Sequence, residues 1–278
     1  MEKKNFTFII TTFKSEDIID DCLKNLPVEC KKIVVENSSN SKLKSNLEFK
    51  YKNLECFIME QNVGYGKANN FGVKKSTTEY VFIINPDVIL TSEKFEEIIS
   101  NLRNISFSIA APIVKDIKVN FDKKKILQVD YVRGYAMIIK REVALSIPFD
   151  ENIFLYLEEI DFCKRAKSKN EKILLVNSEI KHLGGLSHGN RGDFEMEKSR
   201  NWHWMWSSFY YYKKHYGYFY SFLRTFPKFI SSLIKCHYFL LKNEKKKSQI
   251  YKMRYLGLFQ SYRLKESDYR PYNKFKKH

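Results

Sequence analysis

The stretch YVFIINPD, residues 80–87, is a short apolar run that ends in a polar turn. Further runs of similar length lie in the first 180 residues: FTFIITT (6–12), KIVVEN (32–37), ECFIME (55–60) and YAMIIK (135–140). Short, nearly continuous apolar runs are typical of strands that are buried on both faces. We therefore predict a strand at each of these positions.

Polar segments with a helical spacing of apolar residues separate these runs. In residues 15–26 the apolar side chains share one helical stripe, with Ser15 as the expected N-cap and Pro27 ending the helix. Residues 67–76 and 92–102 are the next expected helices, and the polar stretch 115–130 is expected to be a surface loop. Because strands and helices alternate, we predict an α/β domain with a parallel or mixed sheet over residues 1–200.

The composition indicates a folded protein with a strongly basic C-terminal part. Hydrophobic residues make up 44% of the 278 residues, which excludes wholesale disorder. The net charge is +17, and residues 200–278 hold 18 Lys and Arg beside 3 Asp and Glu. The five cysteines are odd in number and none forms C-x-x-C, which argues against disulfides and structural zinc. We find no signal-peptide pattern and no spanning run, so we expect a cytoplasmic protein.

Residues 201–278 are expected to be a helical extension rich in basic and aromatic residues. Thirteen aromatic residues fall between Trp202 and Phe226. In the helical pattern 227–242, one face carries lysines and the opposite face carries Ile230, Leu233, Ile234, His237 and Leu241. Such stripes are most often solvated, and nucleic acids also bind basic and aromatic residues. We favour an interfacial helix at the inner face of the cytoplasmic membrane, and we expect no nucleic-acid partner.

Three polar segments follow apolar runs, at the edge where open α/β sheets bind ligands. The glycines of NVGYGKANNFG (62–72) let the backbone turn closely around a phosphate at a helix N-terminus. Asn85-Pro86-Asp87 can present a carboxylate to a hard divalent cation. Residues 149–165 cluster carboxylates in an apolar stretch; if this segment lines a cleft, the clustering would raise at least one carboxyl pKa and yield a general base. Taken singly, the first segment is more simply a turn that enters a helix, the second is equally a turn, and the charges of the third are usually solvated or paired with a neighbour such as Arg165.

The order and spacing of these segments resemble glycosyltransferase family 2, within it the bacterial rhamnosyltransferase-like group. The matching motifs are Thr12-Phe13-Lys14, Glu36-Asn37-Ser38-Ser39, Asn62-x-Gly64 with Asn69, Asn85-Pro86-Asp87, Phe149-Asp150-Glu151 with Phe154-x-Tyr156-x-Glu158-Glu159-x-Asp161, and His182-x-x-Gly185-x-Ser187. The resemblance covers roughly residues 5–220. It implies the GT-A fold, a Rossmann-like domain with a mixed, mostly parallel sheet, and inverting transfer of a sugar from a nucleotide diphosphate.

The resemblance also implies roles for single residues. Nucleotide-sugar contacts would come from Thr11, Thr12, Glu36, Asn37, Asn62, Gly64, Asn69 and Asn85. Asp87 and His182 would hold Mg²⁺ or Mn²⁺ against the diphosphate, because a metal neutralises charge on that leaving group. Glu159 would be the catalytic base, and Glu158 and Asp161 would orient it or hold sugar hydroxyls.

The expected donor is dTDP-rhamnose, and the expected acceptor is a glycan or polyprenyl-diphosphate-linked glycan of a bacterial surface polysaccharide such as O-antigen. Glu36 and Glu159 are each one methylene longer than the usual Asp of the family, so Glu158 is the alternative base. A UDP-hexose or UDP-galactofuranose is the alternative donor. The alternative from another class is a catalytically inactive binding protein with a basic tail.

Overall fold

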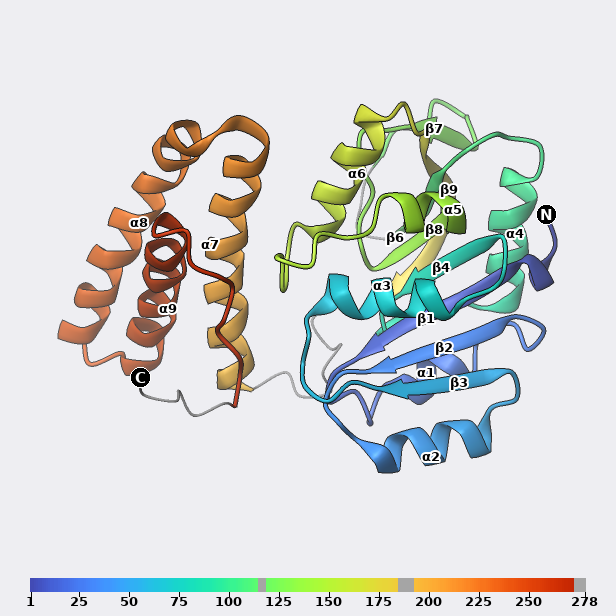
Figure 1. Cartoon of the computed structure of the whole chain (residues 1–278), viewed down its shortest axis with the longest axis horizontal. Coiled ribbons are helices and arrows are strands. Elements are labelled where there is room, and N and C mark those ends of the chain that lie inside the picture. Colours follow the sequence, from blue (N-terminus) through green and yellow to red (C-terminus); the bar gives the residue numbers. More distant parts are fainter. Residues whose placement is uncertain (115–118, 185–192, 273–278) are drawn as a thin grey trace. The chain divides into compact units, whose positions relative to one another are not determined.

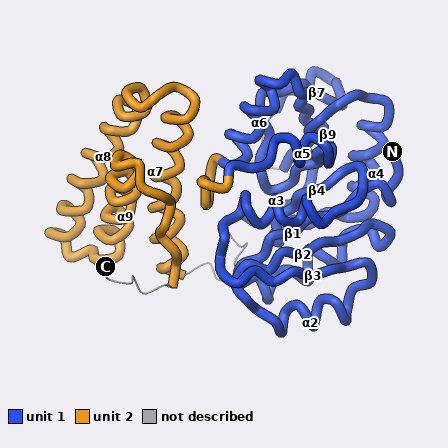
Figure 2. Tube along the Cα trace, viewed as in Figure 1, with its two compact units in different colours: residues 1–150, 158–191 blue, residues 151–157, 192–278 orange. Residues whose placement is uncertain are grey.

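The computed structural model describes residues 1–114, 119–184 and 193–272, which form two compact units (Figure 2). Of these residues, unit 1 contains 1–150 and 158–184, and unit 2 contains 151–157 and 193–272. The segment 151–157 therefore belongs to unit 2 although Glu158, the next residue, belongs to unit 1. The boundary that we expected at residue 200 lies inside helix α7 (Phe194–Tyr216), which is part of unit 2.

Unit 1 is built on a sheet in which the described strands follow the order β3-β2-β1-β4-β8-β6-β9-β5, with β7 paired to β9 (Figure 1). The strands are β1 (Phe6–Thr12), β2 (Lys31–Glu36), β3 (Leu54–Ile58), β4 (Tyr80–Ile84), β5 (Val88–Ile89), β6 (Ile109–Val114), β7 (Ile126–Gln128), β8 (Ala136–Lys140) and β9 (Ile173–His182). Strands β1 to β4 are parallel, as are β6 and β9, whereas β5, β7 and β8 pair antiparallel. The predicted mixed, mostly parallel sheet is confirmed.

Helices cover both faces of this sheet, because neighbouring residues of a buried strand point to opposite sides. The helices of unit 1 are the short 3₁₀ turn Lys3–Asn5, α1 (Ile19–Leu23), α2 (Ser41–Lys50), α3 (Tyr65–Lys75), α4 (Ser92–Leu102), α5 (Arg141–Ser146) and α6 (Glu158–Ser168). Phe8 of β1 belongs to the apolar core that α1, α2 and α4 complete. Its neighbour Ile9 belongs to the core on the other face, with side chains of α3, α5 and α6.

The five predicted strands are present, and so is the predicted helix 92–102, but other predictions need correction. The helix expected over 15–26 is shorter, and its N-cap is Ile18, because the Ser15 hydroxyl accepts a hydrogen bond from the Phe13 N–H instead. The stretch 115–130 is not loop throughout: it contains β7, a half-exposed strand that lacks apolar patterning, and residues 115–118 lie outside the described part. The sequence analysis missed β6 and β9.

Unit 2 is helical, as predicted, and contains α7, α8 (Tyr218–Leu241) and α9 (Lys245–Tyr262). Gly217, whose φ of +87° favours glycine, separates α7 from α8. Helix α8 begins nine residues before the predicted start, because Pro227 lies inside it rather than at its first turn. Among the described residues, no helix combines the length and the apolar character needed to cross a membrane.

Candidate active site

One edge of the sheet in unit 1 collects most of the polar segments that the sequence singled out. Strands β1 and β2 end there in register, with Thr12 opposite Glu36. Strand β9 runs in the same direction and ends at His182. Strand β8 is antiparallel to β4, so that Ala136, its first residue, pairs with Ile84, the last residue of β4. The residues before β8 therefore join the carboxyl ends of the other strands.

Asn37 ties together the loops that follow β2 and β3. Its Nδ2 donates to Asn62 Oδ1 at 2.9 Å, and its Oδ1 accepts from the Val63 N–H at 3.0 Å. The Gly64 N–H donates to the same Asn62 oxygen at 3.1 Å. Gly64 has a φ of +89° and is the N-cap of α3, so glycine is required at this turn. The structure thus brings Asn37, Asn62 and Gly64 together at a helix N-terminus, where an anion is stabilised.

Four other residues expected to contact the nucleotide sugar form two groups: Thr11 pairs with Asn69, whereas Thr12 and Glu36 hold the start of the loop after β2. Thr11 Oγ1 donates to Asn69 Oδ1 at 2.9 Å, and Asn69 Nδ2 is buried without a hydrogen-bond partner among the described residues. Thr12 is buried, and its carbonyl oxygen accepts from the Asn37 N–H at 2.9 Å. The Glu36 carboxylate is also buried and accepts from the backbone N–H groups of Ser38 and Asn40 at 2.9 and 2.6 Å. Glu36 therefore holds the loop after β2.

Asp87 and His182 meet because β5 pairs with β9, with Val88 opposite His182. His182 Nε2 lies 3.4 Å from Asp87 Oδ1. Asn85 Oδ1 is buried nearby in the chain and has no hydrogen-bond partner among the described residues. Among those residues no three His, Cys, Asp or Glu side chains form a metal cluster. The donors fit an open divalent-cation site that phosphate oxygens and water complete. Gly185 and Ser187 of the expected motif lie outside the described residues.

Glu158 and Glu159 are the first residues of α6 and form a pair of largely buried carboxyls. Burial, and then the neighbouring Glu159, raise the pKa of Glu158 well above its ordinary value. Burial also raises the pKa of Glu159, but the Arg133 guanidinium opposes that shift. Asp161 accepts a hydrogen bond from Arg165 Nε at 2.7 Å. Because two adjacent carboxyls resist double ionisation, the pair favours one acid and one carboxylate.

The sequence analysis missed the residues around Gly134, which precede β8. A Cβ placed on Gly134 would lie 3.3 Å from Glu159 Cβ, so this glycine contacts the expected base. Tyr65 Oη donates to the Gly134 carbonyl oxygen at 2.7 Å, and the Tyr135 ring stacks on His182 with centroids 4.7 Å apart. Only carboxyl ends of strands were considered in the sequence, whereas an antiparallel strand brings its amino end to the same edge. The antiparallel direction of β8 was the missing signal.

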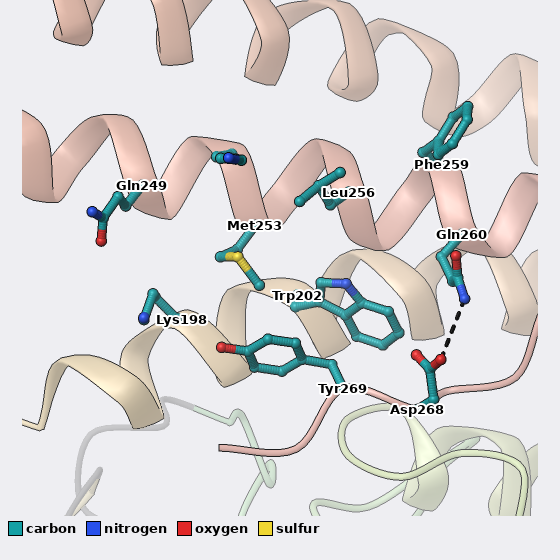
Figure 3. Close-up of a pocket in the computed structure, with 10 residues that line it drawn as sticks. Lys198, Trp202, Gln249, Met253, Leu256, Phe259, Gln260, Asp268 and Tyr269 are labelled. Atoms are coloured by element: carbon teal, nitrogen blue, oxygen red, sulfur yellow. Dashed lines mark hydrogen bonds between the residues drawn. The ribbon is translucent and has the colours of Figure 1, made fainter. Parts of the chain in front are cut away.

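A separate cavity of about 490 Å³ lies within unit 2, between α7, α9 and the segment that follows α9 (Figure 3). The Trp202 and Tyr269 rings stack with centroids 5.8 Å apart, and Gln260 donates to Asp268 at 3.5 Å. None of the residues that the sequence singled out for catalysis, nucleotide-sugar contact or metal binding lines this cavity. The candidate active site is therefore the sheet edge of unit 1.

A model of the family described as "Glycosyl transferase family 2" matches residues 7–158. Low-salt glycan biosynthesis hexosyltransferase Agl10 of Haloferax volcanii is 26% identical over 197 residues, which cover 61% of this chain and 64% of that relative. Rhamnosyltransferase WbbL of Escherichia coli K12 is 24% identical over 236 residues, which cover 70% of this chain and 88% of WbbL. The chain thus spans slightly less than two thirds of the first of these relatives and most of the second.

Solved structures with a similar fold include a mannosyltransferase with bound GDP-Man and a second protein with bound UDP. Mannosyltransferase PcManGT from Pyrobaculum calidifontis, in complex with GDP-Man and Mn²⁺, has a TM-score of 0.58 at 11% identity, with 94% of this chain and 88% of that chain covered. S. aureus TarS 1-349 in complex with UDP has a TM-score of 0.54 at 15% identity, with 93% and 91% covered. At these identities the likeness concerns the fold alone, and it confirms the predicted GT-A class.

Proposed function

The chain belongs to glycosyltransferase family 2, and from this we propose that it is an inverting, metal-dependent enzyme that transfers L-rhamnose from dTDP-rhamnose to a glycan or lipid-linked acceptor of a bacterial surface polysaccharide. The observation that carries the proposal is the sheet edge where Asp87, after β4, meets His182, at the end of β9, and where Gly134, just before β8, contacts Glu159 of the Glu158–Glu159 pair. The likeness to the rhamnosyltransferase WbbL over 88% of its length supports the rhamnosyl donor.

In the proposed reaction an acceptor hydroxyl attacks the anomeric carbon in line, the bond from that carbon to the diphosphate oxygen breaks, and the hydroxyl proton passes to a carboxylate. We assign that carboxylate to Glu159, because the Arg133 guanidinium favours its ionised form. Burial and the neighbouring Glu159 both raise the pKa of Glu158. Glu158 therefore holds its proton and can donate a hydrogen bond to a sugar oxygen. This division of roles follows from the surroundings of two chemically identical side chains.

The remaining residues bind and orient the donor. Asp87 and His182 would hold Mg²⁺ or Mn²⁺, which when bound supplies positive charge against the departing diphosphate. Thr11, Thr12 and Asn37 would line the nucleoside pocket, next to the N-terminus of α3. Glu36 would act through the loop 38–40, whose backbone it holds, and Asp161 would fix α6 through Arg165.

Thermal shift and donor hydrolysis with a panel of nucleotide sugars test this function. We expect dTDP-rhamnose with Mn²⁺ to stabilise the protein and to be hydrolysed slowly, and Asp87→Asn to lose both effects because the cation loses a carboxylate ligand. Asp130→Asn, at an exposed ion pair with Lys167, is the matched control. A response to a UDP-hexose or UDP-galactofuranose alone would identify that nucleotide sugar as the donor in place of dTDP-rhamnose. Silence of the folded protein across the panel would favour the inactive binding protein.

The membrane part of the proposal rests on α8. Side chains at spacings of three, four and seven residues form one exposed apolar stripe on this helix, with 37–89% of each exposed: Phe219, Leu223, Phe226, Ile230, Ile234 and Leu241. Of the apolar face expected from the sequence, Ile230, Ile234 and Leu241 belong to this stripe, whereas Leu233 is half-buried. Lys228 and Lys235 lie on another face of α8, and Lys242 is its C-cap. We propose that this surface lies on an anionic membrane beside a lipid-linked acceptor.

Sedimentation with vesicles of stated composition tests the membrane surface. We expect the full chain to pellet with vesicles containing anionic phosphatidylglycerol and to stay in the supernatant with phosphatidylcholine alone. The double variant Leu223→Ser/Ile234→Ser should weaken binding at least several-fold, because it removes apolar area from the stripe. Leu145→Ser, at an exposed apolar residue of unit 1, is the control. Equal binding of both variants would contradict the proposal.

A further inference from the structure

Tyr65 occupies a central position that none of the assigned roles uses. It is the first residue of α3, directly after the Gly64 N-cap, and its half-buried ring packs against the core that contains Phe162 of α6. Burial, followed by the charge of Glu158, raises the pKa of the Tyr65 hydroxyl. The hydroxyl is therefore a neutral hydrogen-bond donor at physiological pH, close to the carboxyl pair.

The hydroxyl of Tyr65 donates a well-formed hydrogen bond to the Gly134 carbonyl oxygen at 2.7 Å. The next carbonyl, that of Tyr135, accepts from the Asn85 N–H at 2.9 Å. These two hydrogen bonds hold the segment before β8 from two sides. One comes from α3, and the other comes from the turn that contains Asp87. The position of Gly134 is thus set by Tyr65 on one side and by Asn85 on the other.

Gly134 in turn limits where the Glu159 side chain can lie. A Cβ on Gly134 would be 3.3 Å from Cβ, 3.5 Å from Cγ and 3.6 Å from Cδ of Glu159, so the whole glutamate chain runs along the bare Gly134 Cα. A glutamate has one more rotatable bond than an aspartate and therefore needs an additional constraint to keep its carboxylate in place. The Gly134 backbone provides that constraint.

We propose that Tyr65 is a positioning residue for the catalytic base: its hydroxyl holds the Gly134 segment against Glu159 and so fixes the carboxylate that takes the acceptor proton. This inference rests on the proposed function of Glu159. It assigns to the tyrosine a role in the chemical step and none in binding the donor. Loss of the hydroxyl leaves the ring and its packing in place and frees Gly134 to move away from Glu159.

Tyr65→Phe tests the inference through steady-state kinetics of donor hydrolysis or transfer. We expect kcat to fall by roughly tenfold or more and the donor KM to stay within about twofold of wild type. Gly134→Ala should lower kcat through the same link, and the double variant should be no slower than the slower single variant. The control is Tyr51→Phe, which removes a comparable half-buried tyrosine hydrogen bond, to Asp20 at 2.6 Å, from unit 1. The proposal would be overturned by an unchanged kcat, by a rise in the donor KM alone, or by effects of the two substitutions that add up in the double variant.

A measurement without turnover separates this inference from the proposed function. In protein labelled with ¹³C at the glutamate carboxyl, the Glu159 resonance is identified by its loss in Glu159→Gln. We expect Tyr65→Phe to shift that resonance and Tyr51→Phe to leave it in place, because only the first change frees the neighbouring Gly134. If the resonance shifts but the protein hydrolyses no donor, the proposed transferase function is contradicted and the link from Tyr65 through Gly134 to Glu159 is supported. An unmoved resonance would overturn the Tyr65 role.

Discussion

Glu158 and Glu159 are adjacent in the chain, yet their surroundings give them different acidities. Burial raises the pKa of both, the charge of Glu159 raises that of Glu158 further, and Arg133 opposes the shift at Glu159. The sequence predicted a carboxylate cluster and named Glu159 as the base with Glu158 as the alternative. It could not separate the two, because the separation depends on Arg133 and Gly134, which come from another part of the chain.

The raised pKa of Glu158 predicts a pH-dependent gain of stability in Glu158→Gln. In the unfolded chain a glutamate ionises near about 4.3, whereas folded Glu158 keeps its proton to higher pH, so wild-type stability falls as pH rises between these two values. Glutamine carries no such cost. We therefore expect the variant to melt at a higher temperature than wild type at pH 8, by about 2–4 °C per kcal/mol, and at the same temperature at pH 4.

Differential scanning calorimetry at the two pH values checks this expectation. The exposed Glu55→Gln serves as the control, since its side chain lies on the surface of β3. A Glu158→Gln variant that melts below wild type at pH 8 would mean that Glu158 is ionised in the folded protein. The roles assigned to the two glutamates would then be reversed.

At the scale of elements, the sequence predicted the strands that are continuous runs of large apolar residues and missed others: β6 is buried but contains Ala110, Ala111 and Pro112, and β9 mixes buried and exposed residues. The run 80–87 gives β4 followed by the Asn85-Pro86-Asp87 turn, as expected. β7 is half-exposed and exists because it pairs with β9, so its own residues carry little apolar pattern. The direction of β8 was also beyond sequence reasoning, since strand direction follows from the order of strands in the sheet. Gly134 was missed for that reason, and with it the contact of Tyr65, a residue of the segment 62–72 that the sequence did single out.

The packing of α7 against α9 predicts a strong effect of Gly257→Ala. A Cβ at this position would lie 2.3 Å from the Trp202 carbonyl oxygen, and backbone cannot yield as a flexible side chain can. Alanine favours an isolated helix by about 1 kcal/mol, yet we expect a net loss of about 1–3 kcal/mol because α7 and α9 must separate. Urea unfolding followed by tryptophan fluorescence measures this, with Gln249→Ala in α9 as the control. A stabilised Gly257→Ala variant would contradict the packing described for unit 2.

At the scale of the whole molecule, the two units differ in what the sequence could predict. Strands and loops place the motifs of unit 1 one after another along the chain, at fixed spacing. Most residues of the candidate site could therefore be named from the sequence. Unit 2 was predicted only as basic, aromatic and helical. Its helix ends follow from tertiary packing, which allows Pro227 inside α8 and requires Gly257 in α9. The net charge of the chain identifies no fold.

Unit 2 should lose stability in mild acid because of His203. This buried ring lies between Ser267 Oγ and the Tyr269 carbonyl oxygen, at 3.0 and 2.9 Å, and burial lowers its pKa to about 3. In the unfolded chain His203 takes up a proton at about pH 6.5. The free energy of unfolding therefore falls as the pH drops from there towards 3, by about 1.4 kcal/mol per pH unit. All three tryptophans lie in α7, so fluorescence melts report unit 2. His203→Gln should lose this pH dependence, and the exposed His237→Gln should keep it.

The stereochemistry and rate of the transfer reaction itself test the proposed inverting site. The measurement is proton NMR of dTDP-rhamnose turnover with Mn²⁺ by wild type and Glu159→Gln, following both the rate and the anomeric configuration of the first product. We expect wild type to give the inverted anomer and Glu159→Gln to lower kcat by about 10²–10⁴-fold with little change in donor KM, because only the base is removed. A retained anomer, or a Glu159→Gln variant as fast as wild type, would contradict the assignment of this sheet edge as an inverting transferase site with Glu159 as its base.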